Sequence, residues 1–91
     1  MRYSYFAGFK RSFRNLPVER RKRVEEALAR FALALEESDV AAGLGLKKLH
    51  HGFWEIRAGI SDRIVFLKEK DFVEFIFCGT HEDVKRFLKR L

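Results

Sequence analysis

The 91-residue sequence is poor in the features that mark several classes of protein. It has one cysteine, Cys78, which excludes an internal disulfide. No apolar run approaches the roughly 20 residues that cross a membrane, and residues 1–6 lack the apolar core of a secretory signal. These absences lead us to expect a protein of the reducing cytoplasm with no membrane partner.

Two further absences concern metals and cofactors. None of the six glycines belongs to a phosphate-cradling loop or a dinucleotide-binding fingerprint. The three histidines are His50, His51 and His81, and no further His or Cys stands at the spacing of a zinc site. We therefore expect neither a metal site nor a small-molecule cofactor.

Apolar and basic residues, in contrast, are plentiful. Apolar residues make up 47% of the chain and ten are phenylalanine, which is enough for a packed core to offset the entropy of ordering the chain. The length predicts a single domain over residues 1–91. Lysine and arginine number 19 against 13 acidic residues, and the net charge of +6 favours a polyanion or an acidic partner protein.

The first half of the chain predicts one strand and two helices. Residues 2–6 alternate as in a short strand. Residues 9–16 have apolar positions at helical spacing, and Pro17 separates them from a second helix over residues 18–37. Apolar residues recur along one face of that second helix at Val24, Ala27, Leu28, Phe31 and Leu35. Residues 38–46, which include Gly43 and Gly45, predict a loop.

The second half predicts a three-stranded antiparallel meander over residues 53–58, 62–68 and 72–79. Consecutive apolar residues in the third segment predict a strand covered on both faces. Residues 80–83 have the pattern of a helix-capping box, and a short C-terminal helix follows with its apolar stripe at Val84, Phe87, Leu88 and Leu91. The predicted fold class is α+β: a short N-terminal strand, two helices, the meander and a C-terminal helix.

Three polar residues stand where these strands meet their turns. In an up-down-up meander the end of the first strand, the start of the second and the end of the third share one edge of the sheet. Arg57, Arg63 and His81 occupy those places and are expected to converge. Two guanidinium groups beside an imidazole can bind a phosphodiester and move a proton near neutral pH. That chemistry suits cleavage of RNA without a metal.

Each of these residues also has a structural interpretation. The arginines could pair with Glu55, Asp62 or Glu74, and His81 could be a capping or surface histidine. Four further residues are candidates for contact with RNA because they precede or begin the meander: Lys47, Lys48, His50 and Glu55. The lysines and His50 could equally be solvated loop residues, and the carboxylate could be a general base or simply the partner of Arg57.

Several short segments in a fixed order resemble the RelE/ParE family of bacterial toxins. They are Phe9 to Pro17, Gly45-Leu46-Lys47-Lys48-Leu49, Trp54-Glu55-Ile56-Arg57, Arg63-Ile64-Val65-Phe66, and Gly79-Thr80-His81-Glu82-Asp83 with Phe87-Leu88. The resemblance implies a RelE-like toxin fold, a cognate antitoxin that wraps the toxin, and cleavage of messenger RNA in the ribosome.

The resemblance also implies roles for three residues. By position, Arg57 and Arg63 match arginines that hold the scissile phosphate, and His81 matches a histidine that some members use as acid or base. The implied reaction is attack of a ribose 2′-hydroxyl on the adjacent phosphate, in which His81 protonates the leaving 5′-oxygen. RelE itself carries lysines where this chain has Phe53 and Glu55, which implies a different scheme of proton transfer.

Two other functions are compatible with the same segments. One is a ParE-like toxin that inhibits DNA gyrase by binding and needs no nuclease site. The other is a module on the same fold that binds RNA or protein without catalysis.

Overall fold

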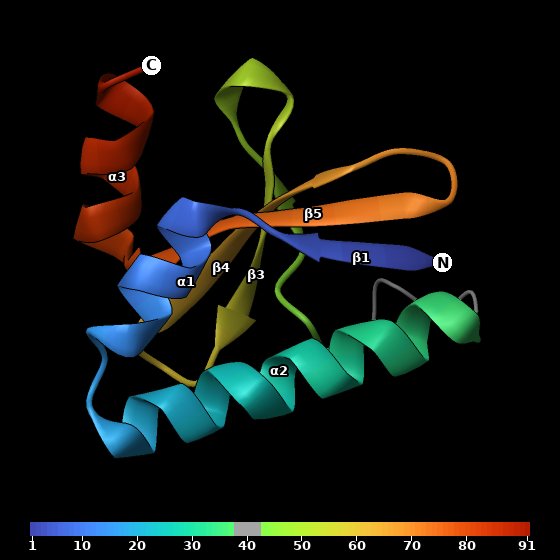
Figure 1. Cartoon of the computed structure of the whole chain (residues 1–91), viewed down its shortest axis with the longest axis horizontal. Helices are drawn as coiled ribbons and strands as arrows, with labels where there is room; N and C mark the ends of the chain where they lie inside the picture. The colour runs from blue at the N-terminus through green and yellow to red at the C-terminus, as the bar shows by residue number, and fades with distance from the viewer. Residues whose placement is uncertain (38–42) are drawn as a thin grey trace.

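The computed structural model describes residues 1–37 and 43–91, and these form an α+β fold (Figure 1). The predicted loop over residues 38–46 lies outside the described residues at positions 38–42. The strands are β1 (Arg2–Tyr5), β2 (Lys47–Lys48), β3 (Trp54–Ala58), β4 (Asp62–Lys68) and β5 (Phe72–Thr80). The helices are α1 (Ala7–Arg14), α2 (Val18–Glu36) and α3 (His81–Lys89), and a short 3₁₀ helix, η1, covers His50–Gly52. The predicted fold class is confirmed.

The described strands form one mixed sheet in the order β1-β5-β4-β3-β2. The meander β3-β4-β5 is antiparallel as predicted, and β1 adds to β5 in parallel. The two-residue strand β2 pairs with β3 at the opposite edge. The sequence pattern did not predict β2 as a strand, because two lysines carry no alternation of apolar and polar residues.

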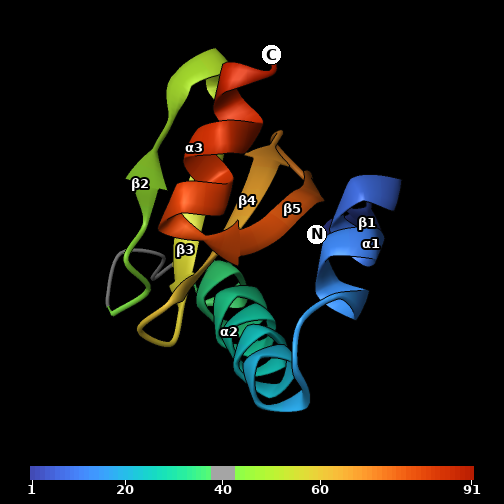
Figure 2. The same ribbon diagram turned by 90° about the vertical axis from the view of Figure 1, so that its left-hand side faces the viewer.

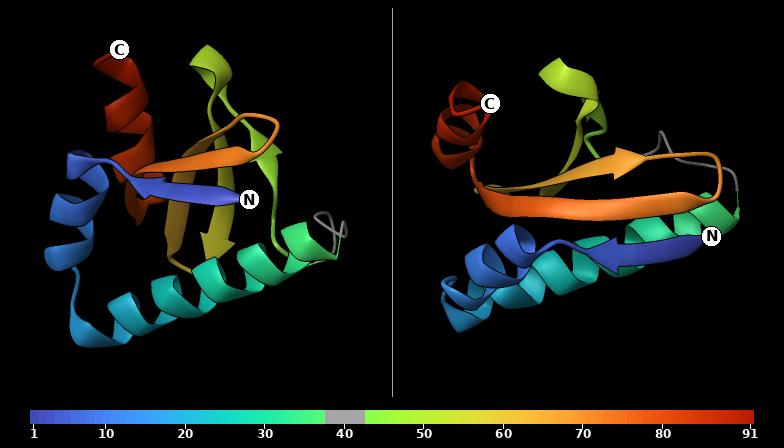
Figure 3. Two further views of the ribbon diagram at one scale, coloured as in Figure 1. Left: turned by 45° about the vertical axis from the view of Figure 1, so that its right-hand side comes forward. Right: turned by 45° about the horizontal axis from the view of Figure 1, so that its top comes forward.

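The helices α1 and α2 cover one face of the sheet (Figure 3). Helix α2 contributes Val24, Ala27 and Phe31, all fully buried, as its apolar spacing predicts. The Phe31 ring packs against Phe66 of β4 with centroids 4.7 Å apart. This face therefore holds the larger part of the apolar core.

Helix α3 lies on the opposite face of the sheet (Figure 2). Val84 is buried there with Val65 and Ile76, and the Phe87 ring stacks on Phe77 at 5.1 Å. Leu91, which the sequence places in the apolar stripe of the C-terminal helix, is instead exposed. Leu91 lies one residue beyond the helix C-cap, so it does not share the apolar face of α3.

A β-bulge explains why the apolar alternation is blurred in β5. Val65 of β4 pairs with Phe77, and the next residue, Phe66, pairs with Phe75, so Ile76 has no partner in β4. The extra residue turns Ile76 toward the α3 face while Phe75 and Cys78 join the core beneath α1 and α2. The prediction of a strand covered on both faces is confirmed.

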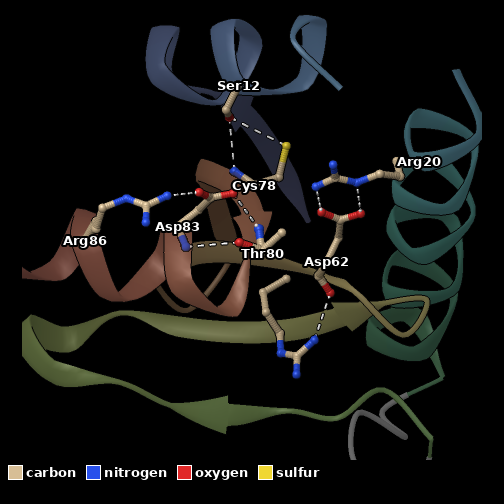
Figure 4. A network of polar contacts seen from close by, with 8 residues as sticks. Ser12, Arg20, Asp62, Cys78, Thr80, Asp83 and Arg86 are labelled. Atoms are coloured by element: carbon tan, nitrogen blue, oxygen red, sulfur yellow. Dashed lines mark hydrogen bonds and ion pairs between the residues drawn. The ribbon is translucent and has the colours of Figure 1, made fainter. Parts of the chain in front are cut away.

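The predicted capping box opens α3. The Thr80 hydroxyl accepts a hydrogen bond from the Asp83 N–H at 3.1 Å, and the Asp83 carboxylate accepts one from the Thr80 N–H at 2.9 Å (Figure 4). The helix therefore begins at His81, directly after the last residue of β5. None of the described helices is long and apolar enough to cross a membrane.

Candidate functional site

The register of β3 and β4 places Arg57 directly opposite Arg63. Opposed residues of an antiparallel pair project to the same face of the sheet, with Cβ atoms about 4.5–5.5 Å apart. Like charges in that arrangement repel one another unless an anion lies between them. The pair is therefore suited to hold an anion with two oxygens, such as a phosphodiester.

A cavity of about 380 Å³, here called the arginine cavity, opens over this pair. Arg57, Arg63 and His81 all line it, so the structure brings the three residues together. The strand register gives the reason. Gly79 of β5 is opposite Arg63, and His81 follows it by two residues at the same edge of the sheet. The remaining lining residues are Gly45, Leu46, Lys47 and Glu55.

The two arginines differ in their partners. Arg63 Nε lies 3.5 Å from Oε2 of Glu55, whose side chain is only 8% exposed, and Arg63 Nη1 donates to the main-chain oxygen of Asp62 at 3.2 Å. Glu55 is thus the partner of Arg63. From the sequence, Arg57 was the suggested partner. Arg57 is exposed and makes no ion pair with any residue in 1–37 or 43–91. Its charge is therefore available to a bound anion.

The Arg57 side chain lies against Gly45, which the sequence places in a predicted loop and at the start of one segment that resembles the RelE/ParE family. Gly45 has a φ of +66°, and a Cβ at this position would overlap Nε and crowd Cγ and Cδ of Arg57. The missing side chain leaves the space through which Arg57 enters the cavity. A glycine in a predicted loop was the only signal for this contact, and it does not identify the neighbour.

Asp62 makes no side-chain ion pair with Arg57 or with Arg63. Its carboxylate is fully buried on the other face of the sheet and accepts two hydrogen bonds from Arg20 of α2, at 2.9 Å from Nε and 2.6 Å from Nη2 (Figure 4). Hydrogen bonding to Asp62 raises the pKa of Arg20. The pair ties α2 to the first residue of β4 and so fixes the backbone directly before Arg63.

A second cavity of about 450 Å³ adjoins the first and is here called the lysine cavity. All four residues that the sequence proposes for RNA contact line it: Lys47, Lys48, His50 and Glu55. Helix α3 supplies Val84, Lys85 and Leu88 to the wall. Lys47, Glu55 and His81 line both cavities, which are therefore contiguous. The Lys48 ammonium lies 5.8 Å from the centre of the Trp54 ring, a cation–π contact.

Cys78 is 1% exposed, and its side chain lies on the opposite face of the sheet from the two cavities, in the core beneath α1. Burial raises the pKa of its thiol to about 11, and its N–H donates to Ser12 Oγ at 3.1 Å (Figure 4). It is therefore a structural residue. Among the residues that the structure describes, no three His, Cys, Asp or Glu side chains are placed to hold a metal ion.

The strand order and the three described helices form a small α+β fold, the RelE/ParE-like fold. The RelB–RelE antitoxin–toxin complex of Methanococcus jannaschii matches with a TM-score of 0.69 and 17% identity, over 92% of this chain and 96% of that one. The DinJ–YafQ complex of Escherichia coli matches with a TM-score of 0.68 and 14% identity, over 92% and 98%. The YoeB dimer of Staphylococcus aureus matches with a TM-score of 0.68 and 12% identity, over 89% and 97%. No family model and no curated protein matches the sequence.

Proposed function

We propose that this protein is the toxin of a type II toxin–antitoxin system and that it cleaves messenger RNA on the ribosome without a metal, so that translation stops. The observation that carries the proposal is the direct opposition of Arg57 and Arg63 beneath a cavity that His81 also lines. Three permanent cations and one carboxylate surround that cavity, which favours a polyanionic substrate.

The reaction follows from the roles these groups can fill. Arg57 and Arg63 bind the two non-bridging oxygens of the phosphodiester and stabilise the charge that develops on them. The 2′-hydroxyl passes its proton to a water molecule as its oxygen attacks the phosphorus, and the bond from phosphorus to the 5′-oxygen breaks. His81 gives its proton to that 5′-oxygen. The products are a 2′,3′-cyclic phosphate and a 5′-hydroxyl.

A cognate antitoxin is the second partner in this proposal. The RelB–RelE and DinJ–YafQ structures are complexes of related folds with antitoxins. The net charge of +6 suits an acidic antitoxin segment as well as RNA. Both partners would compete for the same basic edge, which offers a simple means of inhibition.

The test compares two histidine variants in an assay of mRNA cleavage on ribosomes. We expect His81→Asn to lower the cleavage rate about 100-fold, the usual contribution of a general acid. His51→Asn is the control, because His51 lines neither cavity and asparagine tolerates its φ of +63°.

Three results would overturn the proposal. One is that His81→Asn and His51→Asn both arrest growth and inhibit DNA gyrase but leave RNA uncut. This result would indicate a ParE-like toxin. Another is binding of RNA with no cleavage by the wild type, which would indicate a binding module. The third is cleavage by His81→Asn at the rate of the wild type.

A further inference from the structure

The lysine cavity differs in character from the arginine cavity beside it. Its wall includes three aliphatic side chains, Leu49, Val84 and Leu88, whereas the arginine cavity is lined mainly by charged groups. A volume of about 450 Å³ lies within the range of small-ligand sites. A mostly apolar wall with a few polar groups is typical of small-ligand sites, and beside an anion site it can receive the face of a nucleobase whose phosphate is held nearby.

Glu55 gives this cavity its polarity. The residue is 6% exposed, so its carboxylate is among the few buried charged groups of the described chain. The Arg63 contact of 3.5 Å involves Oε2, and Oε1 has no hydrogen-bond partner among the described residues. An ionised carboxylate only accepts hydrogen bonds, so it selects a ligand that presents N–H donors.

The RNA bases differ in the donors on their Watson–Crick edges. Adenine and cytosine each present an amino group beside an acceptor nitrogen, and uracil presents one N–H between two carbonyl oxygens. Guanine alone presents two adjacent donors, N1–H and the N2 amino group, which match the two oxygens of a carboxylate. The other three bases would each place an acceptor against Glu55, which costs binding energy.

We propose that the lysine cavity binds a guanine base of the RNA, next to the phosphate that Arg57 and Arg63 hold, and that Glu55 selects this base. The inference rests on the proposed function, because it takes the arginine cavity as the phosphate site. The aliphatic wall contacts the faces of the base, and Lys47, which is opposite Glu55 in the strand register, lies between base and phosphate.

The test measures binding by NMR with small probes rather than with the whole substrate. Inorganic phosphate reports on the arginine cavity alone. Guanosine 3′- and 5′-monophosphates are compared with the corresponding cytidine nucleotides. We expect one guanosine nucleotide to bind at least about tenfold more tightly than its cytidine counterpart, a difference of about 1.4 kcal/mol, and to shift the signals of Val84 and Leu88.

Two carboxylate variants complete the design. Glu55→Gln should abolish the preference for guanosine. Because Glu55 pairs with Arg63, the affinity of this variant for inorganic phosphate is measured separately, and the quantity compared is the ratio of guanosine to cytidine nucleotide affinity. Glu82→Gln makes the same change of charge at a side chain that is 69% exposed and lines neither cavity, so its preference should equal that of the wild type.

The outcomes separate this inference from the function on which it rests. Equal binding of guanosine and cytidine nucleotides by the wild type, or a preference that survives Glu55→Gln, overturns the guanine site while phosphate binding stands. Nucleotides that leave Val84 and Leu88 unshifted also overturn it. If the wild type binds no phosphate, or binds it equally well after Arg57→Ala, the phosphate site itself is wrong.

Discussion

Gly45 lies against the side chain of Arg57, at the one place where that side chain passes from β3 into the arginine cavity. The contact leaves no room for a Cβ, and the positive φ of Gly45 disfavours any other residue. A loop residue with no functional group of its own therefore sets the position of a guanidinium that makes no ion pair within the described part of the chain.

The first prediction concerns this contact. Gly45→Ala should displace the Arg57 guanidinium and lower the rate of RNA cleavage about 100-fold, because a displacement of about 1 Å has an effect of that size on a positioned group. The control is Gly52→Ala. Gly52 also has a positive φ, +80°, but no described atom lies within 4 Å of its would-be Cβ.

Both glycine variants should lose similar stability in urea denaturation, since both put alanine in a left-handed conformation. Only Gly45→Ala should weaken the binding of inorganic phosphate. Equal cleavage by the two variants would show that Gly45 does not position Arg57.

The second prediction concerns the ion pair beneath β4. Arg20→Met leaves the fully buried Asp62 carboxylate without its partner and should destabilise the fold by about 3 kcal/mol, as is usual when one member of a buried pair is removed. The double variant Arg20→Met/Asp62→Asn should recover part of that loss, because a neutral amide is easier to bury than an unpaired charge. Chemical denaturation measures both. A single variant as stable as the wild type would contradict this view of the pair.

The third prediction concerns pH and the α3 cap. The hydrogen bond from the Thr80 N–H lowers the pKa of Asp83 below its ordinary value of 3.8. The Asp83 carboxylate therefore stabilises the fold fully above that value, and its contribution is lost as the pH falls through the lowered pKa. Asp83→Asn should be less stable than the wild type at neutral pH, and the difference should shrink in acid.

Urea denaturation at neutral and acidic pH measures this difference. Thr80→Ala, which removes the other half of the capping box, should lose about 1 kcal/mol. The exposed carboxylate of Glu82 serves as the control, because Glu82→Gln should change stability little at either pH. A constant difference between Asp83→Asn and the wild type at all pH values would rule out the ionised cap.

The fourth prediction concerns Cys78. Its thiol is 1% exposed and has a pKa raised to about 11 by burial, so little thiolate is present near neutral pH and reagents cannot reach it. Iodoacetamide should leave the native protein unmodified and should label the unfolded protein fully, as mass spectrometry can show. Rapid labelling of the native protein would mean that α1 opens readily from β5.

Most elements of the fold could be predicted because each has a local pattern. The apolar spacing of α2, the capping residues of α3 and the alternation in β3 and β4 are all readable within a few neighbouring residues. The pairing of β1 with β5 has no such pattern, since parallel pairing joins segments some 70 residues apart. The bulge at Ile76 blurs the alternation of apolar and polar residues in β5, and only the pairing of β5 with β4 locates it.

The candidate site, like the fold, could be predicted only in part from the sequence. Strand order along the chain was sufficient to predict that Arg57, Arg63 and His81 share an edge, because a meander has only one way to place its turns. The sequence could not assign Glu55 to Arg63, Asp62 to Arg20, or Gly45 to Arg57. Those pairings depend on side-chain direction and on contacts between segments that are distant along the chain.

The sequence by itself thus determined the kind of elements, their order and the cationic character of one sheet edge, since these follow from short-range periodicity and charge. Only the tertiary structure decided that Arg63 has an ion-pair partner and that Arg57 has none among residues 1–37 and 43–91. It also created the two adjoining cavities and gave their shared wall a buried carboxylate. Pairing and burial arise when Gly45, Leu46, β2 and α3 close around the same edge, and no local pattern encodes that closure.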